Sequence, residues 1–443
     1  MGQGRADLAI KNVFVFYGGS VLKGCICISD GLIAYVGKEA NAPKADAVIR
    51  AKGLLALPGP IDVHVHLRDE GQAYKEDFFT GTSSAVAGGI TTVLDMPNTV
   101  PPVDSGRRLL ERARKARKAI VANVGFYSLF PPDLEGLVEL ARAGAVGIKV
   151  YFHQPKTKLN ISDPEKLREA VLAANELGLP VAFHAEDPLL IEASSARAEG
   201  GPVEAFVSSH PPEAEVSAVM TLSNLLRGLK VHICHISTPE GLREAKKAGF
   251  TVEATPHHLF LTSDAHARLG PLALMDPPLR PEGAVRDLRE ALYSGLLDVV
   301  ASDHAPHSLE EKMGPNPPPG IPGLETMLPL LLNEVAERRL PLAELVRLLC
   351  AGPADIFGLD RGRLELGGPA DLVLVDLKAK TRIRATDFKS KAKYSPFDGL
   401  EVRGLPVITV VNGSLAFREG EVVAEPGLGS VIRPLRAGGR AEA

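Results

Sequence analysis

The sequence predicts an α/β fold: a (β/α)8 TIM-like barrel that carries a small β-sandwich domain built from both ends of the chain. Three observations lead to this expectation. The chain has 443 residues, more than one small hydrophobic core requires. Apolar, strand-like runs alternate with helical patterns through its middle. Strand-like runs separated only by turns occupy both ends.

Turn residues such as Gly18-Gly19 and Asp30-Gly31 separate the strands at the two ends. The strands are expected over 7–16, 25–29, 32–36, 370–376 and 407–413. We therefore assign residues 1–57 and 361–443 to the β-sandwich domain and residues 58–360 to the barrel. The Gly-, Arg- and Ala-rich segment from about 426 is expected to be poorly ordered.

The middle of the chain alternates eight candidate strands with helices. The strands are expected to end near Leu67, Asn98, Ser128, Phe152, Glu186, Ser237, His257 and Asp303. Helices are expected between them, for example over 163–177, 239–248 and 284–295. Barrels of this kind carry their chemistry at the C-terminal ends of the strands. The Pro-rich run 314–322 is expected to form a loop over the barrel mouth.

Two histidines mark the end of the first barrel strand. His64 and His66 are two residues apart in an alternating apolar segment, so both imidazoles project from the same face. Paired imidazoles at a strand end are typical of a site for a divalent transition metal.

Further potential ligands fall at the ends of other predicted strands. Lys149 lies inside an apolar strand, His184 and His235 end two more, and Asp303 ends the last. A buried neutral lysine amine can add carbon dioxide and become a bidentate carbamate ligand. A lysine paired with an acid, or one reaching the barrel mouth, is the alternative. The predicted metal ligands are His64, His66, Lys149, His184, His235 and Asp303.

This ligand set predicts a hydrolytic mechanism. Two metal ions would generate a hydroxide at neutral pH. Asp303 would take a proton from it during attack and return that proton to the leaving nitrogen. The other histidines are weaker candidates: His232 is expected to be structural, His257 and His258 to pack or support, and His153 and His304 to matter less.

Arg68 indicates the class of substrate. A fixed guanidinium beside a metal site is suited to bind a carboxylate in bidentate fashion. Asn98 and His307 could add donors to the same group. The alternative for Arg68 is a salt bridge with Asp69, Glu70 or Asp77.

The overall composition excludes several kinds of partner. The formal net charge is −4 and there is no basic stripe, so we expect no nucleic acid. No apolar run is long enough to cross a bilayer, so we expect no membrane. The four cysteines form no CxxC pair, which indicates a reducing cytoplasm. Symmetric dimers are the commonest oligomers, so a homodimer is expected.

These motifs give the chain a specific likeness. It resembles the amidohydrolase superfamily, and within it the dihydroorotases of the carboxylated-lysine type, over roughly residues 7–425. The pairing of the HLR and MPNT motifs distinguishes the dihydroorotases, because allantoinases and hydantoinases generally lack this combination of Arg and Asn. The motifs that carry the likeness are DVHVHLRD at 62–69, KEDFFTGTSSAVAGGITTVLDMPNTVPP at 75–102, TPHHLFLT at 255–262, PPLR at 277–280 and SDHAPHSLEEK at 302–312.

The resemblance implies the reversible cyclisation of N-carbamoyl-L-aspartate to L-dihydroorotate in pyrimidine biosynthesis. It implies one or two Zn2+ ions, with two favoured and bridged by carboxylated Lys149. It implies that the substrate carboxylate is bound by Arg68, Asn98 and His307. It also implies backbone contacts from Pro322 and Gly323 of a mobile loop to the pyrimidine ring. An aspartate transcarbamoylase is a further candidate partner.

The chain departs from the family pattern at two positions. Asp276 precedes PPLR where the family often has Asn, and His210 stands where related sequences often have Arg. An extra carboxylate beside an anionic substrate is unfavourable, so Asp276 bears on substrate preference rather than on the reaction class.

Two alternative functions stay open. The first is a related cyclic amidase that acts on hydantoins, dihydropyrimidines or allantoin and needs no clamp for a ring carboxylate. The second is a non-catalytic scaffold, for example one docked on an aspartate transcarbamoylase. Scaffolds of that kind usually lack the metal ligands, whereas all six expected positions here hold residues that can bind a metal.

Overall fold

A parallel eight-stranded barrel forms the larger part of the molecule. The computed structural model describes residues 5–154, 156–157 and 159–435. The barrel strands follow one another in sequence order, each beside its predecessor. They are β6 (Ile61–Val65), β7 (Thr92–Asp95), β8 (Asn123–Ser128), β9 (Gly147–Tyr151), β10 (Val181–His184), β11 (Val231–Ile233), β12 (Thr251–Ala254) and β13 (Val299–Val300).

The barrel closes between its first strand and the segment that follows its last. Val65 forms a parallel bridge with His304, and the His66 backbone N–H donates to the His304 carbonyl at 2.8 Å. This closure brings the ends of β6 and β13 side by side.

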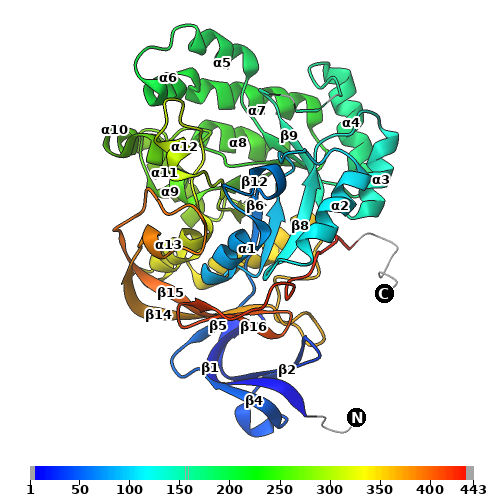
Figure 1. Ribbon diagram of the computed structural model, residues 1–443, viewed down its shortest axis with the longest axis vertical. Coiled ribbons are helices and arrows are strands. Elements are labelled where there is room, and N and C mark those ends of the chain that lie inside the picture. The colour runs from blue at the N-terminus through cyan, green and yellow to red at the C-terminus, as the bar shows by residue number, and fades with distance from the viewer. Residues whose placement is uncertain (1–4, 155, 158, 436–443) are drawn as a thin grey trace.

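Helices follow the barrel strands and cover the outside of the barrel (Figure 1). Several begin with an Asp or Thr cap followed directly by proline, as at Asp163, Asp187, Thr238 and Thr255, a pattern favourable to helix starts. The helices are α1 (Phe78–Ala87), α2 (Gly106–Ala116), α3 (Glu135–Ala143), α4 (Pro164–Glu176), α5 (Pro188–Ser195), α6 (Pro202–Ser209), α7 (Pro212–Leu226), α8 (Pro239–Ala248), α9 (Pro256–Phe260), α10 (Asp264–Leu269), α11 (Glu282–Tyr293), α12 (Leu309–Lys312), α13 (Leu324–Ala336), α14 (Leu342–Val346) and α15 (Gly352–Phe357).

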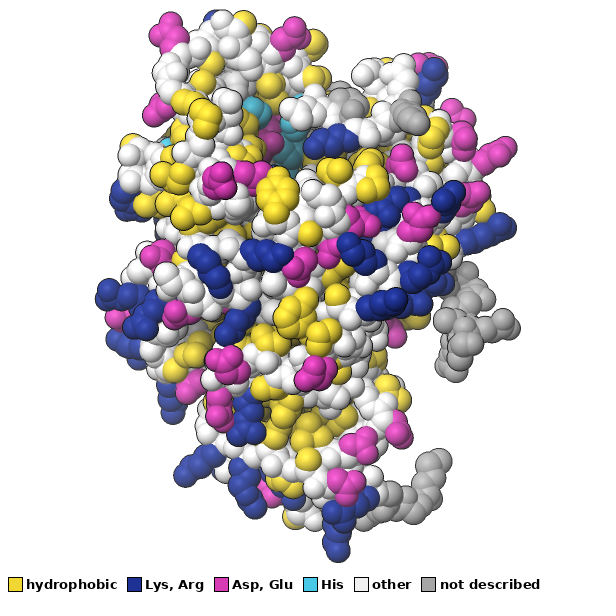
Figure 2. Space-filling view, in the orientation of Figure 1, with side chains coloured by type: hydrophobic (Ala, Val, Ile, Leu, Met, Phe, Trp, Pro, Cys, Tyr) yellow, Lys and Arg dark blue, Asp and Glu magenta, His cyan; other side chains and the backbone are white. Residues whose placement is uncertain are grey.

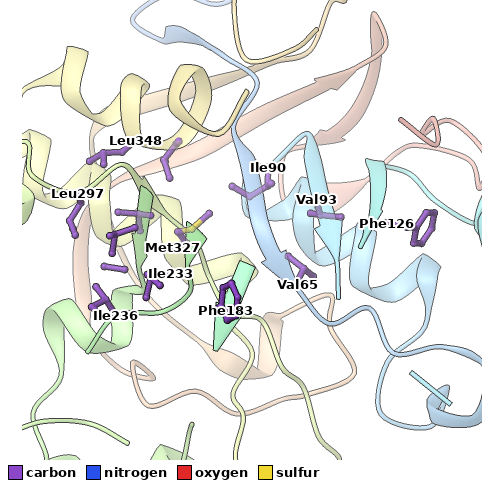
Figure 3. Close-up of a cluster of buried hydrophobic side chains, with 14 of the residues drawn as sticks. Val65, Ile90, Val93, Phe126, Phe183, Ile233, Ile236, Leu297, Met327 and Leu348 are labelled. Carbon is purple, nitrogen blue, oxygen red and sulfur yellow. The ribbon is translucent and has the colours of Figure 1, made fainter. Parts of the chain in front are cut away.

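The main hydrophobic core lies between the barrel strands and these helices. Figure 3 shows part of it, with Val65, Val93 and Phe183 from the strands and Met327 from α13. Each of these side chains is fully buried. Their burial fixes the strands rigidly, and therefore also fixes the residues that follow the strand ends.

Both ends of the described chain contribute to one nine-stranded sheet, at the lower end of the molecule in Figure 1. β5 pairs antiparallel with β14, which joins the N-terminal strands to the C-terminal ones. The strands are β1 (Ala6–Tyr17), β2 (Ser20–Ser29), β3 (Leu32–Gly37), β4 (Ala45–Arg50), β5 (Leu55–Pro58), β14 (Leu372–Arg382), β15 (Glu401–Val411), β16 (Ser414–Arg418) and β17 (Glu421–Val422).

The predicted fold class is confirmed, with one local difference. Residues 426–435 run along the barrel, where Val431 bridges to Val124 and Ile432 is buried. The Gly- and Arg-rich composition around these two apolar residues gave no strand signal. Both nevertheless pack against the edge of a barrel strand. The rest of that tail, 436–443, lies outside the described residues. No described helix is long and apolar enough to cross a membrane.

A buried ion pair ties α2 to the end of β7. Arg112 is fully buried, and its Nε and Nη2 donate to Asp95 at 2.9 and 2.6 Å. Its Nη2 also donates to the Arg68 carbonyl at 3.0 Å. The other Asp95 oxygen accepts from the Leu67 N–H at 2.9 Å. The pair therefore supports the backbone at Arg68, whose φ is 56°.

We predict that Arg112→Met lowers the free energy of unfolding by about 3–5 kcal/mol, because it leaves the Asp95 carboxylate buried without its cation. Urea denaturation followed by circular dichroism measures this loss. Arg107→Met is the matched control, since Arg107 is exposed on the same helix and pairs only with Glu111. That control should change stability by less than about 0.5 kcal/mol. Equal losses in both variants would contradict the role given to Arg112.

Candidate active site

A cavity of about 420 Å³ opens at the C-terminal ends of the barrel strands. Figure 2 shows histidine side chains inside this hollow, near the top of the molecule. Among the residues predicted to act, those that line the cavity are His64, His66, Arg68, Asn98, His184, His235, Asp303 and His307. The barrel thus gathers eight side chains from several separate strand ends.

The histidines after the first strand meet the aspartate after the last one. Nε2 of His64 and Nε2 of His66 lie 3.5 and 3.3 Å from Oδ1 of Asp303. One ligand atom from each of the three residues lies within 4.8 Å of the others. Barrel closure produces this grouping, which is suited to a divalent cation.

Supporting oxygen atoms bind one ring nitrogen of three cavity histidines. Nδ1 of His64 contacts the Glu253 carboxylate, and Nδ1 of His66 lies 2.8 Å from Oδ1 of Asn98. Nε2 of His184 lies 2.7 Å from the Glu186 carboxylate. Metal-binding histidines are held in this way by an oxygen acceptor, which leaves the second nitrogen for the ion.

Burial keeps these imidazoles neutral. It lowers the pKa of His64 and His66 below the usual value, and that of His184 to about 3. Neutral imidazole is the form that binds metals. The cavity therefore presents its histidines ready for an ion at neutral pH.

His235 completes the histidine group. Its ring centroid lies 4.5 Å from that of His184 and 5.2 Å from that of His64. Its Nδ1 is buried without a hydrogen-bond partner. Its backbone has φ 34°, and its N–H donates to Glu253 at 3.0 Å. A buried imidazole nitrogen left unpaired costs free energy unless a ligand binds it.

Lys149 lies behind the histidines, in the interior of β9. Its side chain is 1 % exposed, and its Nζ donates to Sγ of Cys234 at 2.9 Å. No carboxylate among the described residues lies within ion-pairing distance of it. The structure therefore contains neither the acid partner nor the exposed position that the alternative explanation requires.

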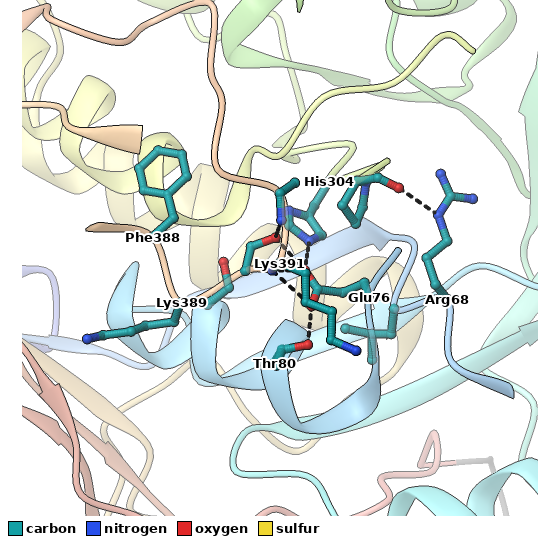
Figure 4. A network of polar contacts seen from close by, with 12 residues as sticks. Arg68, Glu76, Thr80, His304, Phe388, Lys389 and Lys391 are labelled. Atoms are coloured by element: carbon teal, nitrogen blue, oxygen red, sulfur yellow. Dashed lines mark hydrogen bonds and ion pairs between the residues drawn. The ribbon is translucent and has the colours of Figure 1, made fainter. Parts of the chain in front are cut away.

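Arg68 is a buried guanidinium without an acidic partner in the described part of the chain. Its Nε donates to the Pro306 carbonyl at 3.3 Å, as Figure 4 shows. The acids considered as partners pair elsewhere: Asp69 with Lys115, Glu70 with Arg108 and Arg112, and Asp77 with Lys391. Arg68 thus carries a buried positive charge that a bound anion would neutralise.

His307 lies beside Arg68 and bridges to the loop above the cavity. Lys75 Nζ lies 3.1 Å from its Nδ1, and its Nε2 lies 3.1 Å from the Pro319 carbonyl. Burial, and then the charges of Arg68 and Lys75, lower the pKa of His307 strongly. The ring is therefore neutral, accepts from Lys75 at Nδ1 and donates at Nε2.

The predicted loop over the barrel mouth is present, with Pro318, Pro319 and Gly320 facing the cavity. Pro322 and Gly323 do not line it, and the Gly323 N–H donates to Nδ1 of His304 at 3.1 Å. Contacts from these two residues to a ligand therefore stay a prediction.

Gly320 is required by its position in that loop. It has φ 133°, and a Cβ there would lie 2.5 Å from the Ala305 carbonyl oxygen and 3.1 Å from the His307 ring. A side chain would push the loop away from the cavity wall.

Other cavity residues were missed by sequence reasoning or ranked low. Lys75 belongs to a quoted motif, but nothing in its local pattern indicates that it would reach the site. Phe206 lies within α6, and the other members lie in loops or at element ends, where periodicity gives no signal. These lining residues are Tyr151, His153, Lys156, Phe206, His210 and Asp276.

Comparison with known proteins places this geometry in context. The model of the amidohydrolase family matches residues 55–416. A protein of Methanosarcina mazei named dihydroorotase is 37% identical, with 96% of this chain and 97% of that protein covered. A dihydroorotase of Methanothermobacter thermautotrophicus is 38% identical, with coverages of 94% and 95%. The solved L-hydantoinase (dihydropyrimidinase) of Arthrobacter aurescens superposes with a TM-score of 0.91 at 31% identity, covering 97% of this chain and 100% of that one.

One buried lysine holds the loop over the cavity. Lys312 is fully buried, and its Nζ donates to the carbonyls of Leu274, Pro318 and Gly320 at 3.0, 2.9 and 3.1 Å. Burial lowers its pKa to about 7. Lys312 therefore ties the loop to the segment at Leu274 through three hydrogen bonds.

We predict that Lys312→Met loosens this loop, because three carbonyl groups lose their donor. The local loss should be about 1–3 kcal/mol. Amide hydrogen exchange at Gly320 and Ile321 measures it, since faster exchange reports local opening. Lys247→Met on α8 is the control, because Lys247 is exposed and pairs only with Glu244. Unchanged protection of the loop in Lys312→Met would rule out the clamp.

Proposed function

The chain belongs to the amidohydrolase family, and on that premise we propose that it acts as a dihydroorotase. The reaction is the reversible closure of N-carbamoyl-L-aspartate to L-dihydroorotate with release of water, in de novo pyrimidine biosynthesis. The observation that carries the substrate assignment is the buried Arg68 beside the histidine cluster, which has no acidic partner among the described residues. The full-length similarity to dihydroorotases supports the same assignment.

We propose Zn2+ as the metal, as two ions. The donor set fits such ions, since it combines neutral imidazoles, one carboxylate and the unpartnered Nδ1 of His235. When bound, the ions supply Lewis acidity and a source of hydroxide at neutral pH. The residues that would hold them are His64, His66, Lys149, His184, His235 and Asp303.

Lys149 is proposed to act as a carbamate. Its neutral amine nitrogen bonds to the carbon of carbon dioxide, and the proton is released to solvent. The product is an anion with two ligand oxygens, whose charge the metals would neutralise. Its burial and the absence of an ion-pairing acid near it in the described chain support this proposal.

Asp303 is proposed to move the proton. Its Oδ1 lies with the ligand atoms of His64 and His66, which leaves Oδ2 to receive a proton from the attacking water. In ring opening that proton passes to the amide nitrogen as the carbon–nitrogen bond breaks. In ring closure the same atom takes the proton from the ureido nitrogen.

Arg68 is proposed to bind the ring carboxylate. A guanidinium donates two parallel hydrogen bonds to a carboxylate, which orients the ring as well as binding it. His307, held neutral by Lys75 and the loop, stands beside it. Asn98 uses its oxygen for His66, so its amide N–H groups are the donors left for substrate.

A hydantoinase or dihydropyrimidinase is the second candidate, favoured by the close superposition on the solved L-hydantoinase. It would use the same histidine cluster with a ring that carries no carboxylate. Arg68 would then remain an unneutralised buried charge. The homodimer, the cytoplasmic location and an aspartate transcarbamoylase partner stay predictions.

We predict that the zinc-supplemented protein opens L-dihydroorotate and not hydantoin, dihydrouracil or allantoin, as followed by ultraviolet absorbance. Arg68→Ala should lower kcat/KM for dihydroorotate by about 100-fold or more, in the range for loss of a buried charge partner. Any residual activity on the neutral rings should not change, and it serves as the internal control. Preference of the unmodified protein for a neutral ring would contradict the substrate assignment.

We predict that Lys149→Ala loses at least about 100-fold in activity, because a metal ligand is removed. Added acetate or propionate with zinc should restore part of it, since a small carboxylate can occupy the vacated space. Lys166→Ala, at an exposed position on α4, is the control. A Lys149→Ala variant with full activity would show that Lys149 does not hold the metals.

A further inference from the structure

A second group of potential ligands lies in the cavity wall, separate from the six residues assigned to the metals above. It consists of His153, Glu186, His210 and Asp276, which we call the wall cluster. One ligand atom from each of the four lies within 4.8 Å of the others. We propose that the wall cluster binds an additional divalent transition-metal ion. This proposal does not rest on the identity of the substrate.

The four residues come from segments far apart in the sequence. His153 follows β9, Glu186 follows β10, His210 ends α6, and Asp276 precedes Pro277. Donor atoms about 2.1 Å from a zinc ion lie about 3.4 Å apart in a tetrahedron. The observed limit of 4.8 Å is wider than that, so the four side chains would move inward when an ion binds.

Glu186 is the strongest indication that a ligand is missing from this group. Its side chain is fully buried, and only Oε2 has a partner, Nε2 of His184 at 2.7 Å. Oε1 is buried without any hydrogen-bond partner. A buried carboxylate oxygen that accepts nothing is costly, and a cation is the natural way to satisfy it.

Asp276 adds a second negative group that also lacks a compensating cation. Its Oδ1 is buried without a hydrogen-bond partner among the described residues, where His184 and His153 are its ion-pairing neighbours within 4.0 Å and the Glu186 carboxylate is in contact with it. Within the described residues neither Asp276 nor Glu186 has a lysine or arginine at ion-pairing distance. Two adjacent carboxylates therefore lie in a buried wall, an arrangement that a bound cation stabilises.

The two histidines of the cluster present ring nitrogens to the two carboxylates. Nδ1 of His210 lies 2.9 Å from the Phe206 carbonyl, which can only accept, so Nδ1 carries a hydrogen and Nε2 is the nitrogen that can bind a ligand. Burial lowers the pKa of His153 to about 3, and its Nδ1 is buried without a partner among the described residues. Imidazole nitrogens can bind a metal together with carboxylate oxygens.

Two imidazoles and two carboxylates favour a borderline transition metal such as zinc over magnesium or calcium, which prefer oxygen ligands alone. A divalent ion would also cancel the two negative charges in a cavity proposed to receive an anionic substrate.

Zinc stoichiometry tests the proposal without reference to activity. Metal-free protein is dialysed against buffered Zn2+, and bound zinc is measured by inductively coupled plasma mass spectrometry. The unmodified protein should bind one ion per protomer more than His210→Ala or Asp276→Asn at the same free zinc concentration. Asp276→Asn is nearly isosteric, so it covers the case in which His210→Ala folds poorly.

His266→Ala is the matched control, because His266 is a partly buried histidine on α10 outside the cavity. It should bind as much zinc as the unmodified protein. Equal zinc content in the unmodified protein, His210→Ala and Asp276→Asn would overturn the proposal and show that the two acids share a proton instead. Zinc content is measured without substrate, so failure of the dihydroorotase assignment would leave this result readable.

Discussion

Closure of the barrel between β6 and the segment after β13 is the constraint on which the site depends. The fully buried Asp62 accepts hydrogen bonds from the backbone N–H groups of His64 and Ser302, each at 3.1 Å. Further along the same two segments, the His66 N–H donates to the His304 carbonyl. These contacts bring the first and last barrel strands together, so His64 and His66 must face Asp303. Without closure the three ligands would lie at opposite edges of an open sheet.

Electrostatics in the cavity follow from burial. Glu253 serves several groups at once, since it contacts His64, His232 and the His235 backbone N–H. The neighbouring imidazoles of His64 and His232 hold the pKa of Glu253 well below its usual value. Lys149 and Arg68, in contrast, have no acidic partner among the described residues. The cavity therefore keeps charges that only bound cations and anions can balance, which is the physical signature of a binding site.

One buried acid of the barrel, Glu76, joins the C-terminal segment before β15 to the barrel closure. Glu76 contacts Ser390, accepts from the Lys391 N–H at 3.3 Å and lies 3.6 Å from Nε2 of His304, a network drawn in Figure 4. His304 in turn accepts from Gly323 at the base of the loop. The segment before β15 thus supports both the barrel closure and the loop that covers the site.

The sequence by itself determined the fold class and predicted the principal ligands. The alternation of apolar residues has a period of two, so it places His64 and His66 on one strand face. The same local pattern shows where each strand ends and which polar residues follow it. Only the tertiary structure decided that Arg68 and Lys149 lack acidic partners, that Lys312 holds the loop, and that the wall cluster exists. His153, Glu186, His210 and Asp276 come from four segments whose proximity is set by how strands and helices pack. Contacts between residues distant in sequence leave no mark in local periodicity, so no sequence pattern could bring those four side chains together.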